Sequence, residues 1–181
     1  MSFAIRRYAG ADHAAVRDLF IRINAELAPA ELQEAFVGYV AVSLRDEIDR
    51  LSDYYAERQG SFWVAYDGPR IAGMFGLERV GTPAAELRRM YVDRAYRKRG
   101  IARMMLERAE RICRDAGTPM LTLSTSELQQ AALVFYRRAG YRPAREEIGA
   151  AQSNKTVGGA IRRYHFEKRL GFSWKTSPLL T

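Results

Sequence analysis

Residues 90–102 read MYVDRAYRKRGIA, a strand-like start that runs through a basic segment into the beginning of a helix. A helix that begins directly after a strand leaves several backbone N–H groups unpaired at the positive end of its dipole, and such an end binds phosphate groups. Gly100 lets the backbone approach a ligand closely, and Ala102 keeps the next turn free of bulk. Four basic side chains add charge around this point: Arg97, Lys98, Arg99 and Arg103. The stretch is therefore expected to bind a pyrophosphate.

A second interpretation of these residues is a solvated basic loop before an ordinary helix, and the segments that follow favour the ligand site. Residues 100–116 place apolar side chains on one helical face, and the pattern ends at Gly117 with Pro119 beyond it. Residues 120–125 then form a short strand. Strand, helix and strand in this order favour a right-handed crossover that joins two parallel strands.

The chain before residue 90 predicts a strand, helical segments and an antiparallel meander. Residues 3–8 form a short strand, and Asp12 opens an amphipathic helix. A second helical pattern runs from about residue 31 to residue 57 as one helix or two, since Gly38 and Ser43 weaken its middle. Three strands with short connections follow over residues 62–66, 71–80 and 86–92.

The chain beyond residue 125 predicts one more helix and two closing strands. The helix covers residues 129–139 and stops at Gly140, and the strands cover residues 141–148 and 161–170. The chain of 181 residues suffices for one sizeable core, whereas two domains would each be small and marginal. We therefore expect a single domain over residues 1–170 and a C-terminal tail over residues 171–181.

Two stretches resemble motifs of the GCN5-related N-acetyltransferase (GNAT) family. Residues 90–102 look like its acetyl-CoA-binding motif, whose core is Q/R-x-x-G-x-G/A. Residues 132–141, ALVFYRRAGY, are similar to its second motif, which ends F-Y-x-x-x-G-F/Y. The resemblance covers roughly Phe3 to Leu170 and implies an α/β (α+β) fold, the GNAT fold, with a central mixed twisted sheet of about seven strands flanked by about four helices. It also implies acetyl-CoA-dependent transfer of an acetyl group to a primary amine.

The same resemblance implies which residues bind acetyl-CoA. Backbone groups of Met90 and Val92 would bind the acetyl and pantetheine part, and amides from Arg97 to Arg103 would hold the pyrophosphate. The expected acetyl-CoA-binding residues are Met90, Tyr91, Val92, Arg97, Lys98, Arg99, Gly100, Ile101, Ala102, Arg103, Gln129 and Tyr136. The chain departs from the family at Arg94, where a proline is common, and at Gln129, where an asparagine is common. The first change alters the loop, and the second offers the same amide one methylene further out.

The chemistry of acetyl transfer requires a neutral amine and a stabilised thiolate. An alkyl ammonium of pKa about 10.4 costs roughly 4 to 5 kcal/mol to deprotonate at pH 7, so a lysine-like acceptor depends most on a base. The resemblance implies Tyr136 as the general acid, because this hydroxyl lies beside the CoA sulfur in the family. It implies Glu86 as a base acting through water. Glu78 on the preceding strand is the rival base, and Ser124 is a further polar candidate. The competing interpretations are a core aromatic for Tyr136 and a surface glutamate for Glu86.

A stripe of four aromatic residues and one valine, called the aromatic stripe below, lies in the region that forms the wall of the acceptor site in the family. It consists of Phe36, Tyr39, Val40, Tyr54 and Tyr55. A helix packed on the sheet would use the same residues, and this structural role is expected for most of them. The acceptor itself stays open between a small amine, an antibiotic, a peptide N-terminus and a protein lysine, because fold does not decide it.

Composition excludes some classes of protein. No segment approaches the run of about 18 apolar residues that a membrane span needs. A single cysteine, Cys113, cannot form an internal disulfide, and His13 and His165 form no cluster with metal-ligand spacing, so no metal site is expected. The N-terminal residues have none of the features of a secretory signal, so a cytoplasmic location is expected.

The formal charge of +8 is compatible with nucleic acid, a membrane surface or an anionic ligand. No helix-turn-helix, zinc-finger or RNA-binding signature accompanies the charge, so a nucleic-acid-binding module is the weaker alternative to the enzyme. A second alternative is a CoA-binding sensor without turnover. An exposed strand edge at the C-terminal end would allow a homodimer.

Overall fold

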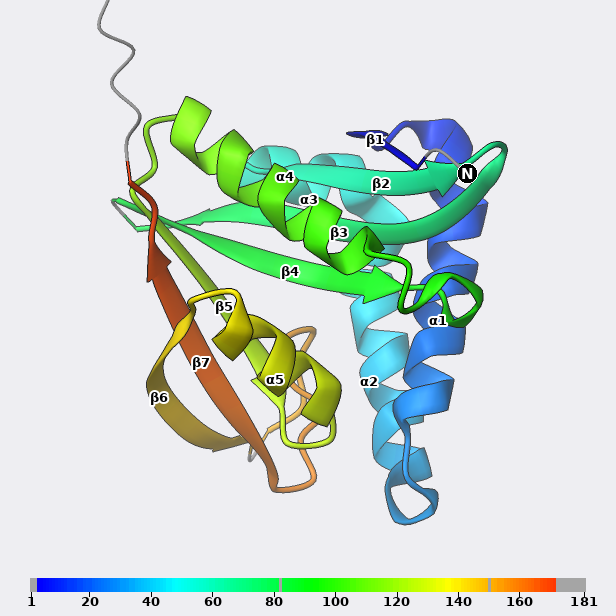
Figure 1. Cartoon of the computed structure of the whole chain (residues 1–181). Coiled ribbons are helices and arrows are strands. Elements are labelled where there is room, and N and C mark those ends of the chain that lie inside the picture. Colours follow the sequence, from blue (N-terminus) through cyan, green and yellow to red (C-terminus); the bar gives the residue numbers. More distant parts are fainter. Residues whose placement is uncertain (1–2, 82, 150, 172–181) are drawn as a thin grey trace, which may run out of the picture.

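Seven strands form one mixed sheet in the order β1-β2-β3-β4-β5-β7-β6 (Figure 1). The computed structural model describes residues 3–81, 83–149 and 151–171. The strands are β1 (Ala4–Arg7), β2 (Ser61–Asp67), β3 (Arg70–Val80), β4 (Ala84–Val92), β5 (Met120–Ser126), β6 (Arg142–Gly149) and β7 (Ile161–Arg169). All neighbours in the sheet are antiparallel except β4 and β5, which are parallel. The predicted meander and the parallel strand–helix–strand unit are therefore confirmed.

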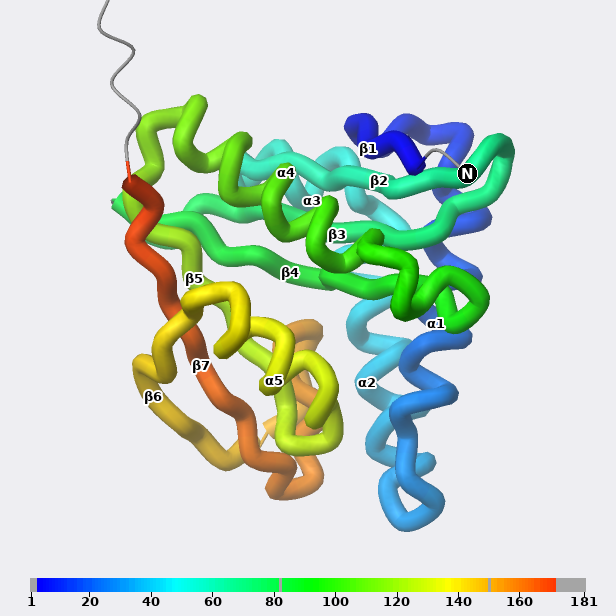
Figure 2. The backbone as a smooth tube through the Cα atoms, viewed as in Figure 1, coloured from blue at the N-terminus to red at the C-terminus, as the bar shows by residue number. Residues whose placement is uncertain are grey.

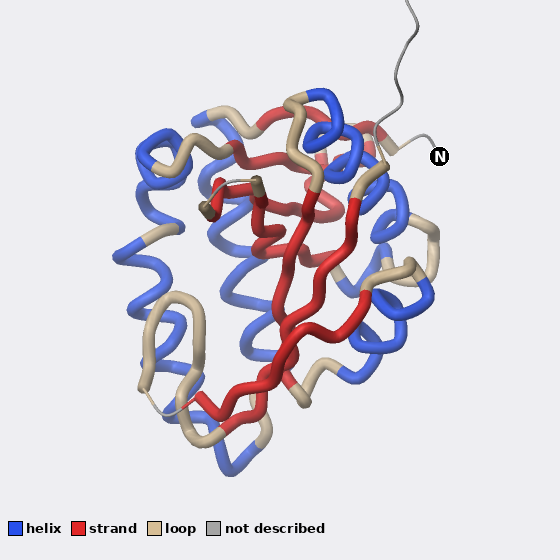
Figure 3. Tube along the Cα trace, turned by 90° about the vertical axis from the view of Figure 1, so that its left-hand side faces the viewer, coloured by secondary structure: helices blue, strands red, loops and turns tan. Residues whose placement is uncertain are grey.

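Five α-helices cover the two faces of this sheet (Figures 2 and 3). One face carries α1 (His13–Leu27), α2 (Gln33–Asp46) and α3 (Leu51–Glu57), and the other carries α4 (Ile101–Asp115) and α5 (Gln130–Arg138). Short 3₁₀ turns, η1 (Gly10–Asp12), η2 (Ala30–Leu32), η3 (Ile48–Arg50) and η4 (Arg94–Tyr96), join them to their neighbours. The expected fold is confirmed, and the part of the chain described has one α-helix more than the expected four.

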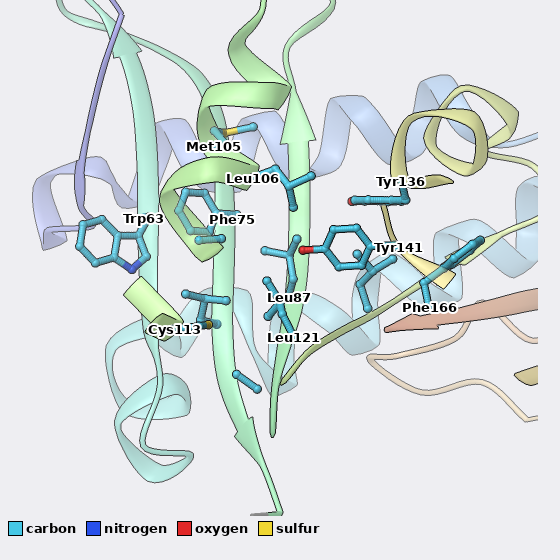
Figure 4. Close-up of a cluster of buried hydrophobic side chains, with 14 of the residues drawn as sticks. Trp63, Phe75, Leu87, Met105, Leu106, Cys113, Leu121, Tyr136, Tyr141 and Phe166 are labelled. Atoms are coloured by element: carbon cyan, nitrogen blue, oxygen red, sulfur yellow. The ribbon is translucent and has the colours of Figure 1, made fainter. Parts of the chain in front are cut away.

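Alternation along the strands produces a separate apolar core on each face. In β2, Phe62 and Val64 pack with α1 to α3, whereas Trp63 and Ala65 pack with α4. The second core contains most of the side chains drawn in Figure 4 and extends under α5. Cys113 belongs to this core as a free thiol, and burial raises its pKa to about 11. Its role is therefore packing.

The additional helix arises because the helical pattern over residues 31–57 is interrupted at Glu47. The expectation that Gly38 or Ser43 would mark the weak point is wrong, since both lie inside α2. Glu47 instead leaves helical geometry, with φ −139° and ψ −61°. Its carboxylate is fully buried against two arginines of β4, and the backbone departs from the helix at the residue that makes this contact.

Several element boundaries differ from the sequence pattern by one residue. Helix α1 begins at His13 with Asp12 as its N-cap residue, and the Asp12 carboxylate accepts hydrogen bonds from Arg6 at 2.6 and 2.8 Å instead of capping the helix. Gly100 and Gln129 are the residues directly before α4 and α5. The predicted tail lies, from residue 172 onward, outside the described residues. Over the described ranges, no helix is both long and apolar enough to cross a membrane.

Candidate functional site

An opening between β4 and β5 defines the candidate site. The parallel ladder between the two strands ends at Leu87 and Leu123, although β4 continues to Val92 and β5 to Ser126. Strands that separate in this way leave main-chain groups without partners in the ladder, and these groups are available to a ligand. A cavity of about 130 Å³ lies there. Its lining includes Asn24, Phe36, Tyr39, Glu86, Met90, Ser124, Gln129 and Tyr136.

A β-bulge bends β4 just after this ladder ends. Gly76 pairs with Arg88 and Met74 with Tyr91, so two residues of β4 lie opposite one residue of β3. Arg89 lies in the bulge with φ +51°, a conformation that non-glycine residues rarely adopt. Such a conformation costs on the order of 1 to 3 kcal/mol and persists only where the surroundings hold it. The bulge places Met90 next to the cavity.

The start of α4 has the backbone arrangement expected of a phosphate cradle. Gly100 has φ +82°, and Met104 N–H donates to its carbonyl at 3.1 Å. The N–H groups of Ile101, Ala102 and Arg103 therefore precede the first bond of the helix and have no acceptor within it. No atom lies within 4 Å of where a Cβ on Gly100 would be, so glycine is required by backbone conformation, and open space lies in front of it.

The basic side chains of this segment are less available than their number suggests. The Arg97 guanidinium donates to the Val92 carbonyl at 3.2 Å and to Glu26 of α1 at 2.9 Å. Arg103 pairs with Glu107 at 2.8 Å on the exposed surface of α4. The Arg99 guanidinium lies 5.5 Å from the centroid of the Tyr96 ring. A pyrophosphate here would therefore be held first by the backbone.

The three predicted residues of β4 pack on different faces of the sheet. Met90 and Val92 pack toward the α4 core, whereas the Tyr91 ring packs on Phe20 of α1 at 6.2 Å between ring centroids. Met90 and Tyr91 line the cavity, whereas Val92 is not part of its lining. The Val92 carbonyl already accepts a hydrogen bond from Arg97, so this predicted contact would require that bond to be shared.

Tyr136 projects from α5 toward β4, with its hydroxyl at the leading end (Figure 4). The ring is buried and lies against Phe135, Tyr141 and Phe166 at centroid distances of 5.3, 5.8 and 6.5 Å. Burial raises the pKa of Tyr136 well above its usual value, so the hydroxyl stays protonated. The side chain is thus a core aromatic whose protonated hydroxyl is available for hydrogen bonding at the cavity it lines.

Gln129 lines the cavity at the start of α5, and its side chain turns back to β5. Its Oε1 accepts a hydrogen bond from the Thr125 hydroxyl at 2.9 Å. Ser124 also lines the cavity, and its hydroxyl accepts a hydrogen bond from Arg163. Both side chains are therefore positioned by neighbours on β5 and β7.

The two candidate bases are cross-strand neighbours. Glu78 of β3 pairs in register with Glu86 of β4, and the Lys155 ammonium lies 2.6 Å from the first carboxylate and 2.8 Å from the second. Glu86 lines the cavity with Tyr136, whereas Glu78 is almost fully buried beneath it. Burial opposes the charge of Glu78, but Arg88 and Lys155 more than offset it and hold its pKa below the ordinary value. The geometry favours Glu86 over Glu78 as the accessible base.

A buried charge cluster behind the bulge was missed in the sequence. Glu47 accepts from Arg88 at 2.7 Å and from Arg89 at 2.7 and 3.1 Å, and all three side chains are buried. The Asn154 carbonyl accepts from both arginines at 3.2 and 2.7 Å. Burial opposes the charge of Glu47, but Arg89 and Arg88 outweigh it and hold its pKa below the ordinary value. Adjacent arginines inside an apolar strand are the one sequence signal for this cluster.

The aromatic stripe divides between the cavity and the core. Phe36 and Tyr39 line the cavity, which is compatible with the acceptor-wall hypothesis, and Tyr39 is at the same time a buried residue of the core under α1 to α3. Tyr54 and Tyr55 are buried beneath the sheet, where their hydroxyls donate to Glu78 at 3.2 Å and to Glu47 at 2.9 Å. Val40 packs against the same core. The structural interpretation therefore holds for these last three residues.

Comparison with known proteins places these features in a family. Residues 28–141 match the model of the Acetyltransferase (GNAT) family. The chain is 32% identical over 109 residues to N-acetyltransferase 8F1 of Rattus norvegicus, covering 58% of this chain and 49% of that protein. The chain spans about half the length of the curated relatives it matches.

Solved structures of low sequence identity share the fold. An acetyltransferase of the GNAT family from Staphylococcus aureus Mu50 superposes with a TM-score of 0.72 at 19% identity, covering 94% of this chain and all of that one. The PaiA N-acetyltransferase from Thermoplasma acidophilum, solved in complex with coenzyme A, gives 0.68 at 20% identity and covers 93% and 99%. The family match includes both the α4 cradle and Tyr136. This chain belongs to the GNAT acetyltransferase family.

Proposed function

We propose that this protein is an acetyl-CoA-dependent N-acetyltransferase that transfers an acetyl group to a primary amine. The observation that carries the proposal is that Tyr136 and Glu86 line one cavity at the opening between β4 and β5, and that β4 runs from this opening toward the start of α4. Backbone N–H groups at the start of α4 fit a pyrophosphate, and the unpaired end of β4 fits an extended polar chain. The relative from Thermoplasma acidophilum, which holds coenzyme A on the same fold, supports this choice of ligand.

The reaction can be assigned to residues of this chain. Acetyl-CoA, when bound, supplies the activated acetyl group as a thioester. Glu86 accepts a proton from the acceptor ammonium, directly or through one water, and the freed amine nitrogen attacks the acetyl carbonyl carbon. A C–N bond forms as the C–S bond breaks, and Tyr136 donates its proton to the departing sulfur. The attacking nitrogen releases its second proton to water, which leaves the neutral amide. Solvent then restores the proton of Tyr136 and removes that of Glu86.

The two alternatives lose support for physical reasons. A nucleic-acid module needs basic side chains free to contact a phosphate backbone, whereas Arg97 and Arg103 are paired with glutamates. A sensor without turnover needs no proton donor, yet the protonated Tyr136 hydroxyl borders the cavity. The domain limits, the cytoplasmic location and a homodimer through the edge strand β6 stay predictions, as does each residue's role in binding.

The test is a screen of amine classes for acetyl-CoA-dependent release of free CoA thiol. Release with at least one class of primary amine is the expected result. Acetyl-CoA binding without release for any class would favour the sensor instead. Salt-sensitive retention on DNA without affinity for CoA would favour the nucleic-acid module.

Gly100→Trp is expected to weaken acetyl-CoA binding by about tenfold or more, which corresponds to at least about 1.4 kcal/mol. The indole would project into the open space in front of the α4 cradle, and the positive φ of this residue disfavours any side chain. Isothermal titration calorimetry measures the affinity. Gly68→Trp is the matched control, because Gly68 also has positive φ and open space but lies in the β2–β3 turn. Equal acetyl-CoA affinities for the two variants would mean that the pyrophosphate does not bind at the start of α4.

Glu86→Gln is expected to lower turnover by about 100-fold, the low end of general base catalysis, with the greatest loss below neutral pH. The acceptor is hardest to deprotonate there, so the base contributes most. Steady-state turnover between pH 6 and pH 9 provides the profile, and Glu78→Gln is the comparison on the neighbouring strand. A profile that changes with Glu78→Gln and not with Glu86→Gln would exchange the roles of the two carboxylates.

A further inference from the structure

The loop between β6 and β7 is anchored to the helical layer on the acceptor side of the site. Figure 3 shows this loop extending beside α2, and Gln152 Nε2 donates to the Ala35 carbonyl at 2.8 Å. Two residues later, Asn154 Nδ2 donates to Glu47 and to the Tyr54 hydroxyl, both at 3.2 Å. The loop is thus fixed immediately before Lys155, and this restricts where the Lys155 side chain can lie.

The Lys155 side chain lies at a pair of carboxylates on β3 and β4, those of Glu78 and Glu86. Like charges directly opposite each other in a sheet are destabilising, so Glu78 and Glu86 require a cation between them. Lys155 supplies it at 2.6 and 2.8 Å. Its side chain is still 40% exposed, whereas those of Glu78 and Glu86 are 3% and 16% exposed. Lys155 is therefore the most exposed side chain of the three.

Lys155 also lies where two cavities meet. The first is the opening between β4 and β5, and the second lies over β5, β6 and β7, lined by side chains such as Thr122, Arg145 and His165. Glu86, Lys155 and Arg163 line both. Arg163 is held by Glu147 at 3.1 Å and by Ser124. Of these three side chains, Lys155 is the one on a loop, and displacement of its long side chain would widen the connection between the two cavities beside Glu86.

We propose that Lys155 is a specificity-determining residue of the acceptor site: its ammonium occupies the position on Glu78 and Glu86 that the acceptor ammonium takes, and the acceptor enters through the second cavity by displacing it. This inference rests on the proposed function, because it takes Glu86 as the base. A primary amine arrives at neutral pH as an ammonium, with the same charge and donors as the Lys155 side chain. Both cannot hold the same carboxylates, so the tethered ammonium competes with every acceptor.

Lys155 acts here as a competitor and not as an acceptor. Burial opposes its charge, but Glu86 and Glu78 more than offset this and hold the pKa of Lys155 above its ordinary value. Its amine therefore stays protonated and is not a nucleophile. A tethered group acts at an effective concentration of millimolar or above, so its removal increases the apparent affinity of an external amine.

The experiment compares the intact protein with Lys155→Ala, using n-propylamine as the acceptor and release of CoA thiol as the readout. The KM for n-propylamine is expected to fall by about tenfold in the variant. The turnover number and the acetyl-CoA affinity are expected to stay within about threefold. If Lys155 formed only a structural ion pair, its removal would not lower the KM while leaving the turnover number unchanged. Glu78 keeps Arg88 at 3.2 Å, so the variant should fold, and Lys155→Met is the second variant if it does not.

Lys168→Ala is the matched control. The ammonium of Lys168, a partly exposed residue of β7, also lies 2.7 Å from a buried glutamate, Glu110 of α4. Neither residue lines the two cavities. Removal of the Lys168 ammonium is expected to leave the KM for n-propylamine unchanged. An unchanged KM in folded Lys155→Ala, or an equal fall in both variants, would overturn the proposal.

Thermal unfolding separates the subsite from the reaction if neither protein releases thiol. n-Propylammonium chloride is expected to raise the melting temperature of Lys155→Ala more than that of the intact protein, relative to sodium chloride at equal ionic strength. Stabilisation without thiol release would support the ammonium subsite and contradict the proposed function. If neither stabilisation nor thiol release is observed, the proposed role of Lys155 is overturned.

Discussion

Glu47→Ala is expected to lower the free energy of unfolding by about 3 to 5 kcal/mol, because it leaves two buried guanidinium groups without their shared carboxylate. Arg88 and Arg89 have side chains 6% and 4% exposed, so water cannot replace the lost partner. For a chain of this size the loss corresponds to a fall of very roughly 6 to 20 °C in melting temperature. Urea denaturation of both proteins measures it.

The control for this prediction is Glu57→Ala, which removes an exposed carboxylate paired with Arg50 and Arg58. No resolvable change is expected there, since water solvates the two arginines. A similar small change for Glu47→Ala would mean that the cluster relaxes toward solvent. It would also remove the cluster as the support for the bulge at Arg89.

The same cluster has a defined pH dependence. The folded-state pKa of Glu47 is lowered, so its contribution to stability is present above the unfolded value of about 4.3 and is lost as pH falls below it. Glu47→Ala is therefore expected to be less stable at pH 7 and to lose less further stability on acidification than the intact protein. Urea denaturation between pH 7 and pH 3 tests the direction, and an unchanged pH dependence would contradict it.

Tyr136→Phe is expected to reduce the maximal rate by about 10- to 100-fold, which corresponds to roughly 1.4 to 2.7 kcal/mol of transition-state stabilisation. The phenylalanine ring would keep its contacts with Phe135, Tyr141 and Phe166, and only the proton donor is lost. A thiol of pKa near 8.5 is already a fair leaving group, so the proton contributes at the low end of general acid catalysis. Steady-state turnover and acetyl-CoA affinity are measured on both proteins.

Unchanged turnover, with chemistry limiting the rate, would remove Tyr136 from the mechanism. Water or the Ser124 hydroxyl would then be the proton source, although Ser124 already bonds to Arg163. A larger loss with weakened acetyl-CoA binding would instead indicate a structural role for the hydroxyl. A donor that serves only the leaving thiolate should not affect the ground-state complex.

Much of the fold was predictable from local patterns. Alternation in β2 and β3 and helical spacing in α4 depend on neighbours within a few residues, and that is the range over which periodicity is visible. The glycine before α4 was found from the local strand-to-helix pattern, and the tyrosine of α5 from the resemblance to the second family motif. Their roles in binding and catalysis stay predictions. The helix boundary at Glu47 was not predictable, because its cause is a contact with another part of the chain.

The sequence by itself determined the family and the order of elements, since both depend on residues close together in the chain. It also predicted where a phosphate would bind. Only the tertiary structure decided which charges meet. Arg88 and Glu47 are separated by 41 residues, and Lys155 and Glu86 by 69. Sheet register, the bulge at Arg89 and the anchored β6–β7 loop bring these groups together. A pairing of this kind leaves no periodic trace in the sequence, because its strength depends on burial and distance in the folded chain.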